Sequence, residues 1–195
     1  MKRTEFMDKH AHFFYALKLP EEVKQVMNDH FLSFKDTLPF GSWVHHEDLH
    51  ITLAFLGSAP EDILSSSRRF VGEAINGFSS FSLEIDQLGF FGKEDSPRVL
   101  WAHTGEKEEL KLLRNKVYDA CTVAGFRLET RPFRPHITLA RRWKGTEPFV
   151  MNKASDLWQR IQDGPIKFHA EEVVLYQTHL ERSPKYEVIS SYRLK

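Results

Sequence analysis

The stretch His50-Ile-Thr-Leu-Ala54 recurs unchanged as His136-Ile-Thr-Leu-Ala140, 86 positions further along the chain. Roughly 1–2% of chains of this length and average composition would contain such a repeat by chance. Because side chains alternate along a strand, each copy predicts a β-strand with isoleucine and leucine on a buried face. The histidine and threonine of each copy then share the opposite face. Two such strands side by side would bring two histidines and two threonines together.

The segments around the two copies predict one α+β unit used twice. Alternating or apolar runs indicate strands at 12–19, 50–57, 81–90, 98–103, 136–140, 166–169, 172–178 and 186–193. Helical periodicity indicates helices at 21–35, 106–123 and 152–162, and one that ends near residue 75. Ser58-Ala-Pro-Glu61 has the spacing of a capping box for that helix, and Pro39-Phe-Gly-Ser42 is typical of a turn.

We therefore expect a bilobal, pseudo-twofold duplication, with two antiparallel sheets flanked by helices around a central cleft. No linker separates the halves, so residues 1–195 are expected to form a single domain of two intimately packed lobes.

The composition excludes several functional classes. Lysine plus arginine and aspartate plus glutamate number 27 each, so no global positive field favours general coating of nucleic acid. The single cysteine, Cys121, lies on the apolar stripe of a predicted helix, where a buried thiol is expected, and it suits a reducing compartment. No apolar run is long enough to cross a membrane, and residues 1–8 lack a signal-peptide pattern. We expect a cytoplasmic protein that does not bind membranes.

Two imidazoles that face one small anion can divide the work of hydrolysis. One takes a proton from water and the other gives a proton to the leaving oxygen, and histidine suits both roles near neutral pH. The hydroxyls of Thr52 and Thr138 would bind non-bridging phosphate oxygens between His50 and His136. No metal or other cofactor is needed if water is the nucleophile. A strained cyclic phosphate is the natural substrate, because opening its ring lowers the barrier.

Positive charge gathers around the second motif. Residues 131–144 contain Arg131, Arg134, Arg141, Arg142 and Lys144, with no acidic residue among them. A guanidinium group matches the shape of a phosphate, and we select Arg141 as the phosphate-binding candidate. Strict alternation, however, would put Arg141 on the face of Ile137 and Leu139. It can join the histidines only if the strand twists or ends there.

His50 also belongs to a different motif, which suggests another function. His46-Glu-Asp-Leu-His50 matches the H-E-x-x-H pattern of zinc proteases, which binds zinc only when both histidines share one face of a helix. Here the motif runs into the β-rich segment Ile51–Gly57, and Pro39 and Gly41 leave little room upstream for a helix to begin. A zinc hydrolase is therefore the weaker alternative, and the zinc pattern does not explain the second pentapeptide.

These residues resemble the two-histidine phosphoesterase superfamily, and within it the bacterial RNA 2′,3′-cyclic phosphodiesterases, also called the 2′-5′ RNA ligase family. The resemblance extends over most of the chain. Its most specific block is Phe133–Arg141. The likeness also includes Phe13–Leu17, Trp43–Gly57, Pro97–Trp101 and Val174–Tyr176.

The resemblance implies a metal-independent enzyme that opens a 2′,3′-cyclic phosphate on RNA ends or small nucleotides to a 2′-phosphate. By that resemblance His50 would be the proton donor and His136 the proton acceptor, while Thr52, Thr138 and Arg141 would bind the phosphate. The reverse reaction, 2′-5′ ligation of RNA ends, would be open to the same site. We expect a monomer. A non-catalytic nucleotide- or RNA-binding module is the other alternative, although binding alone does not need a pair of histidines.

Overall fold

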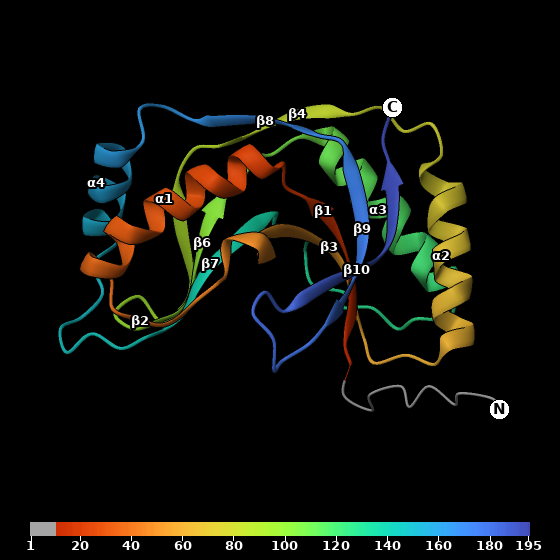
Figure 1. The fold of residues 1–195 in the computed structure, drawn as a ribbon, viewed down its shortest axis with the longest axis horizontal. Coiled ribbons are helices and arrows are strands. Elements are labelled where there is room, and N and C mark those ends of the chain that lie inside the picture. The colour runs from red at the N-terminus through yellow and green to blue at the C-terminus, as the bar shows by residue number, and fades with distance from the viewer. Residues whose placement is uncertain (1–10) are drawn as a thin grey trace.

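The two motif segments form neighbouring antiparallel strands in the computed structural model, which describes residues 11–195. These strands are β3 (His50–Gly57) and β7 (His136–Trp143), and they meet in the middle of an eight-stranded sheet (Figure 1). The residues considered for a signal peptide lie outside the described range.

The rest of this sheet extends outward from the two motif strands. Beyond β3 lie β1 (Phe13–Lys18), β9 (Glu172–Thr178) and β10 (Tyr186–Arg193). Beyond β7 lie β6 (Pro97–His103) and β5 (Leu88–Gly92), and β2 (Phe40–Trp43) also pairs with β7. A separate two-stranded sheet consists of β4 (Phe81–Ile85) and β8 (Ile166–Ala170). Because all the recorded pairings are antiparallel, the predicted α+β class with two antiparallel sheets is confirmed, whereas the division into two lobes stays a prediction.

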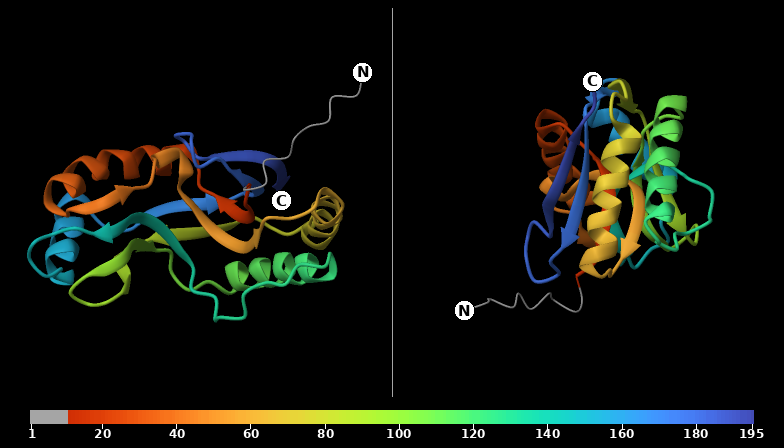
Figure 2. Two further views of the ribbon diagram at one scale, coloured as in Figure 1. Left: turned by 90° about the horizontal axis from the view of Figure 1, so that it is seen from below. Right: turned by 90° about the vertical axis from the view of Figure 1, so that its right-hand side faces the viewer.

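Four helices accompany the strands in the described part of the chain. α1 (Glu21–Thr37) and α4 (Met151–Ile161) lie at one end of the molecule, and α2 (Glu61–Ile75) and α3 (Glu108–Val123) lie at the other, as Figures 1 and 2 show. α2 contacts β10, α3 contacts β3 and α2, and α4 contacts β5. None of these helices is long and apolar enough to cross a membrane.

The core forms between these helices and one face of the large sheet. Ile51 and Ile137 are fully buried in it, and Leu53 and Leu139 join them there, as the alternation of the motif predicts. The helices contribute their apolar stripes to the same core, including Cys121 of α3, whose thiol is buried as expected. Burial raises the pKa of this thiol to about 12, so Cys121 remains a neutral core side chain.

Three local predictions are wrong. Residues 40–43 form strand β2 instead of a turn, because they pair with β7 across Ser42 and Arg141. The predicted strand 81–90 is two strands in different sheets, which are separated at Asp86. The capping box is absent, since α2 begins at Glu61 with Pro60 as its N-cap residue and without a side-chain cap. A residue that precedes proline disfavours helical geometry, so Ala59 cannot belong to a helix capped by Ser58.

Candidate active site

The register of β3 and β7 brings the four motif side chains together. Ile51 and Ile137 are direct partners on antiparallel strands. Extending this register by one residue each way puts His50 opposite Thr138 and Thr52 opposite His136. All four side chains lie on the side of the sheet away from the core and are half-buried. We call this surface, defined by His50, Thr52, His136 and Thr138, the histidine face.

A β-bulge resolves the position of Arg141. In the pairing of β6 with β7, Trp101 pairs with Thr138 and Leu100 with Ala140, so Leu139 is an extra residue. The extra residue shifts the alternation by one, and Leu139 and Ala140 are both fully buried while Arg141 is exposed. Arg141 therefore returns to the histidine face, two rungs beyond Thr138. The strand neither ends there nor needs to twist to bring it back.

The same bulge occurs in the first motif. Tyr15 and Ala16 of β1 pair with Ala54 and Thr52, which leaves Leu53 as the extra residue. The two copies of the pentapeptide thus share their local backbone irregularity as well as their sequence. Each bulge lies directly after the threonine, so the fifth residue past each histidine returns to the histidine face.

Both imidazoles are oriented by main-chain carbonyl groups. Nδ1 of His50 donates to the carbonyl oxygen of Asp48 at 2.7 Å, and Nδ1 of His136 donates to that of Arg134 at 2.7 Å. A carbonyl can only accept, so Nδ1 carries the proton in each ring, and Nε2 of the neutral ring has a free lone pair. Nε2 of His50 lies 3.1 Å from Oγ1 of Thr52, whereas Nε2 of His136 has no hydrogen-bond partner within the described residues.

Aromatic side chains enclose both histidines. The ring centroid of His50 lies 4.8 Å from Phe14, 5.3 Å from Tyr186 and 5.8 Å from Tyr176. His136 meets the edge of Phe91 at 5.0 Å and lies 6.1 Å from Trp101. These rings displace water from the imidazoles, and a desolvated imidazole holds a proton less tightly.

The pKa values of both histidines are lowered. Burial lowers the pKa of His50 to about 4, although its hydrogen bond to Asp48 opposes this shift, and the charges of His136 and Arg141 lower it further. Burial also lowers the pKa of His136, with Arg141 acting in the same direction. The positive charge of Arg141 therefore lowers the pKa of both imidazole rings. Without an anion both imidazoles are neutral near pH 7, and the site holds one guanidinium group beside two proton acceptors.

The other basic residues of this region are arranged differently. Arg131 pairs with Glu129 on the surface. Arg134 orients His136 through its main-chain oxygen, and Arg142 adopts a left-handed φ of 63° directly after Arg141. Lys144 packs across Gly41 of β2. None of these four is a charge that shifts the pKa of His50 or His136.

Asp48 connects His50 to the hairpin between β9 and β10. Its buried carboxylate accepts hydrogen bonds from the main-chain N–H groups of Lys185 (2.9 and 3.0 Å) and Tyr186 (3.1 Å). The ring of Tyr186 packs on His50. Asp48 therefore positions both the His50 imidazole, through its main-chain oxygen, and the aromatic ring beside it, through its carboxylate. Asp48 was not predicted from the sequence, where it stood only as a spacer in the zinc-like pattern.

The zinc-like pattern does not lie on an α-helix, as the zinc-protease motif requires. His46 lies in a single 3-10 turn (His46–Asp48) and His50 lies in β3, so the two do not share a face of an α-helix. Within residues 11–195, no group of three or more histidine, cysteine, aspartate and glutamate side chains is arranged to hold a metal ion.

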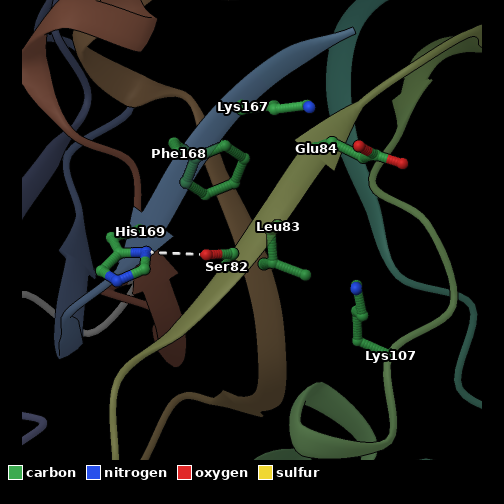
Figure 3. A pocket seen from close by; sticks show the side chains of 7 residues that line it. All are labelled: Ser82, Leu83, Glu84, Lys107, Lys167, Phe168 and His169. Carbon is green, nitrogen blue, oxygen red and sulfur yellow. Dashed lines mark hydrogen bonds between the residues drawn. The ribbon is translucent and has the colours of Figure 1, made fainter.

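A pocket of about 490 Å³ lies away from the histidine face, over β4 and β8. Figure 3 shows its lining, in which Ser82 and His169 are joined by a hydrogen bond of 3.0 Å. Glu84 lies near two lysines there, so the charges of this pocket are mixed, and neither motif histidine lines it.

Several functional candidates had no clear signal in the sequence. Phe91 and Trp101 come from the hairpin of β5 and β6, and Tyr176 and Tyr186 come from that of β9 and β10. Only the order of strands in the sheet brings these two hairpins to the histidines. Phe14 is 4% exposed and packs on His50 and Tyr186, so it is a buried part of the wall around His50.

Comparison with known proteins identifies the family. Residues 21–182 match the model of the 2′-5′ RNA ligase superfamily. An RNA 2′,3′-cyclic phosphodiesterase of Geobacillus stearothermophilus is 39% identical over 95% of this chain, which spans only 58% of the length of that relative. An RNA 2′,3′-cyclic phosphodiesterase of Bacillus subtilis is 34% identical, with 96% of this chain and 98% of the relative covered. The crystal structure of TT0787 of Thermus thermophilus is 27% identical and has a TM-score of 0.71, with 94% of this chain and 97% of that chain covered.

Proposed function

Because the chain belongs to the 2′-5′ RNA ligase superfamily, we propose that it hydrolyses RNA terminal 2′,3′-cyclic phosphates to 2′-phosphates by two-histidine acid–base catalysis. The observation that carries this proposal is the pair of imidazoles on adjacent strands, each held by an Nδ1–H···O=C bond so that Nε2 is the reactive atom. The names of the curated relatives support the same activity.

The reaction balances with water and the two histidines alone. Nε2 of His136 takes a proton from water as the water oxygen bonds to phosphorus, and the bond from phosphorus to the 3′-oxygen breaks. His50, protonated at Nε2, gives its proton to that oxygen, and the 2′-phosphate remains. Exchange of protons with solvent then resets the pair. Among residues 11–195, no cluster of three or more metal-ligating side chains accompanies the histidines. We propose that the reaction needs neither a metal nor another cofactor.

The surroundings of the two rings support this division of roles. Nε2 of His136 has no protein partner among the described residues and is free to accept a proton from water. Nε2 of His50 already lies beside the hydroxyl of Thr52. The low pKa of the free His50 ring does not oppose a donor role, because a bound phosphate anion stabilises imidazolium and raises the pKa.

Thr52, Thr138 and Arg141 would hold the phosphate. The two hydroxyls flank the rings on the histidine face, and the guanidinium group lies two rungs beyond Thr138. Arg141 adds a charge that strengthens its hydrogen bonds to phosphate oxygens. Its effect on the pKa of both histidines supports a position close to the two rings.

The same site would also join RNA ends. A 5′-hydroxyl group would take the place of water as the nucleophile and give its proton to His136, while the 3′-oxygen leaves with a proton from His50, so that a 2′-5′ link forms as the cyclic phosphate opens. We propose this ligation as a secondary activity of a cytoplasmic monomer, for which the single cysteine supports a reducing compartment.

The test is hydrolysis of an RNA oligomer that ends in a 2′,3′-cyclic phosphate, in excess EDTA, with identification of the product isomer. We expect the 2′-phosphate, and loss of roughly 10² to 10⁴ in rate for His50→Ala and for His136→Ala. His169→Ala, an exposed histidine on β8, is the matched control. Binding of the oligomer without turnover under any condition would instead favour a binding module, and activity that needs added zinc would favour the metal hydrolase.

A further inference from the structure

A third histidine, His103 of β6, borders the histidine face. It pairs directly with His136 across the antiparallel strands β6 and β7, which lie side by side in Figure 1. Directly opposed residues point to the same face of a sheet, with Cβ atoms about 4.5–5.5 Å apart. The neighbouring residues agree with this direction, because Ala102 is fully buried in the core, and the ring of Trp101 lies 6.2 Å from that of His103 and 6.1 Å from that of His136. His103 thus stands next to His136, on the side away from β3.

The ring of His103 is held by Asp86. Nδ1 of His103 lies 2.8 Å from a carboxylate oxygen of Asp86 and 3.3 Å from the main-chain nitrogen of Gly105. One ring nitrogen cannot donate to the first and accept from the second at once, and the shorter contact, to a charged group, is the stronger one. Nδ1 therefore carries the proton in the neutral ring. Nε2, which has no hydrogen-bond partner among residues 11–195, is left with a free lone pair.

The position of Asp86 sets the direction of this lone pair. Asp86 lies just before β5, and the next residue, Gln87, accepts a hydrogen bond from the main-chain N–H of His103. Because β5 and β7 lie on opposite sides of β6, the bond to Asp86 turns Nδ1 away from β7. Nε2 belongs to the opposite edge of the imidazole ring, and that edge is left on the side of His136.

A water molecule that attacks the phosphate has a use for a second acceptor. In the proposed hydrolysis, water approaches phosphorus on the side of His136 while the 3′-oxygen leaves on the side of His50. Water has two protons, and Nε2 of His136 takes only one of them. An acceptor for the other proton would fix the orientation of the water and aim its lone pair at phosphorus. His103 lies on the correct side of the phosphate for this, because it is beyond His136 as seen from His50.

We propose that His103, held by Asp86, binds the attacking water and makes the site prefer water to an alcohol as the nucleophile. This inference rests on the proposed function and deepens it by assigning the residue that selects the nucleophile. An alcohol such as the 5′-hydroxyl group of RNA has one proton, which goes to His136 and leaves Nε2 of His103 without a donor. A polar group left unpaired in this way costs free energy, so His103 favours hydrolysis over ligation.

The experiment measures which nucleophile the site uses. Adenosine 2′,3′-cyclic phosphate is incubated with the protein in water that contains methanol, and the initial ratio of adenosine 2′-phosphate to its methyl ester is determined. Both products come from the same bound substrate, so their ratio depends neither on the folded fraction nor on KM. In His103→Phe the ratio should shift towards the methyl ester by about 2- to 10-fold, which is the effect of one hydrogen bond. His169→Phe, on β8, is the matched control and should keep the wild-type ratio.

Two further variants separate the acceptor atom from the shape of the ring. His103→Gln places an amide oxygen close to the position of Nε2 and should restore the wild-type ratio. Asp86→Ala leaves the N–H of Gly105 as the partner of Nδ1, which puts the ring proton on Nε2, and should shift the ratio as His103→Phe does. An unchanged ratio in His103→Phe, with equal losses of both products, would overturn the proposal. A wild-type protein that forms neither product would instead contradict the proposed function.

Discussion

Asp48 and Tyr186 are joined by a hydrogen bond of 3.1 Å from the main-chain N–H of Tyr186 to the carboxylate of Asp48, 138 residues away in sequence. The same Asp48 accepts the Nδ1 proton of His50 through its main-chain oxygen. The hairpin that supplies Tyr186 is thereby attached to the segment that orients His50. The orientation of the His50 imidazole and its packing against Tyr186 therefore depend on a contact between two distant parts of the chain.

Replacing Asp48 should destabilise the protein and disturb His50. Asp48→Ala leaves the N–H groups of Lys185 and Tyr186 without acceptors, and we expect the free energy of unfolding to fall by roughly 2–4 kcal/mol. Asp48→Asn keeps an acceptor oxygen and should lose less. Chemical denaturation measures both effects, and Glu181→Gln, an exposed carboxylate in the same hairpin loop, is the control. An Asp48→Ala protein as stable as the wild type would contradict the anchoring role.

Removing the charge of Arg141 should affect both histidines at once. In Arg141→Gln the pKa of His50 and that of His136 should rise, since the positive charge that opposes imidazolium is gone. Loss of a charge-assisted hydrogen bond to phosphate should lower kcat/KM by about 10- to 100-fold. NMR titration of the two rings and steady-state kinetics provide the measurements. Arg131→Gln should change neither quantity, because Arg131 pairs with Glu129 instead.

The pH dependence of the rate should be bell-shaped and should shift when substrate binds. kcat/KM reports the free protein, in which both histidine pKa values are lowered, so its maximum should lie below pH 6.5. kcat reports the bound state, in which the phosphate anion stabilises imidazolium and raises both pKa values. Its maximum should therefore lie at higher pH. Two profiles with the same maximum would show that the anion does not act on the histidines.

Stability should decrease as the pH falls, because of His50. The unfolded histidine binds a proton near pH 6.5, whereas the folded one binds it only near pH 4. Between these values the unfolded state holds more protons, so stability is lost on acidification, by up to about 3 kcal/mol from this residue. His50→Asn should show a smaller loss between pH 7 and pH 4.5 in chemical denaturation. His169→Asn, at an exposed position, should follow the wild type.

The sequence was sufficient to predict the motif strands, the helices and the four motif side chains on one face. It did not reveal the bulges, because a bulge depends on how the residues of a strand pair with those of its neighbour. Nothing in the sequence around Leu139 indicates that this residue is the extra one. The same limit explains why Arg141 was assigned to the wrong face by alternation. Strand β2 was missed for a similar reason, since Phe40 and Trp43 become strand only through β7, which is about 100 residues away.

The division of residues 81–90 had a different cause. The chain leaves one sheet after Ile85 and enters the other at Leu88, and the carbonyl oxygen of Asp86 accepts a hydrogen bond from the indole of Trp158 between them. Nothing in the alternation of Phe81, Leu83 and Ile85 marks this change of partner. Tertiary contacts made by α4 decide where the first strand ends.

The single register pair between β3 and β7 has a consequence for the width of the site. Ile51 and Ile137 join the two strands at one rung, beneath the four polar side chains of the histidine face. Both side chains are fully buried, so no substrate touches them. Their packing nevertheless sets the gap across which the histidines face each other. We therefore expect the distance between the two imidazoles to depend on packing in the core, so that a substitution of a buried hydrophobic residue at this rung would change it.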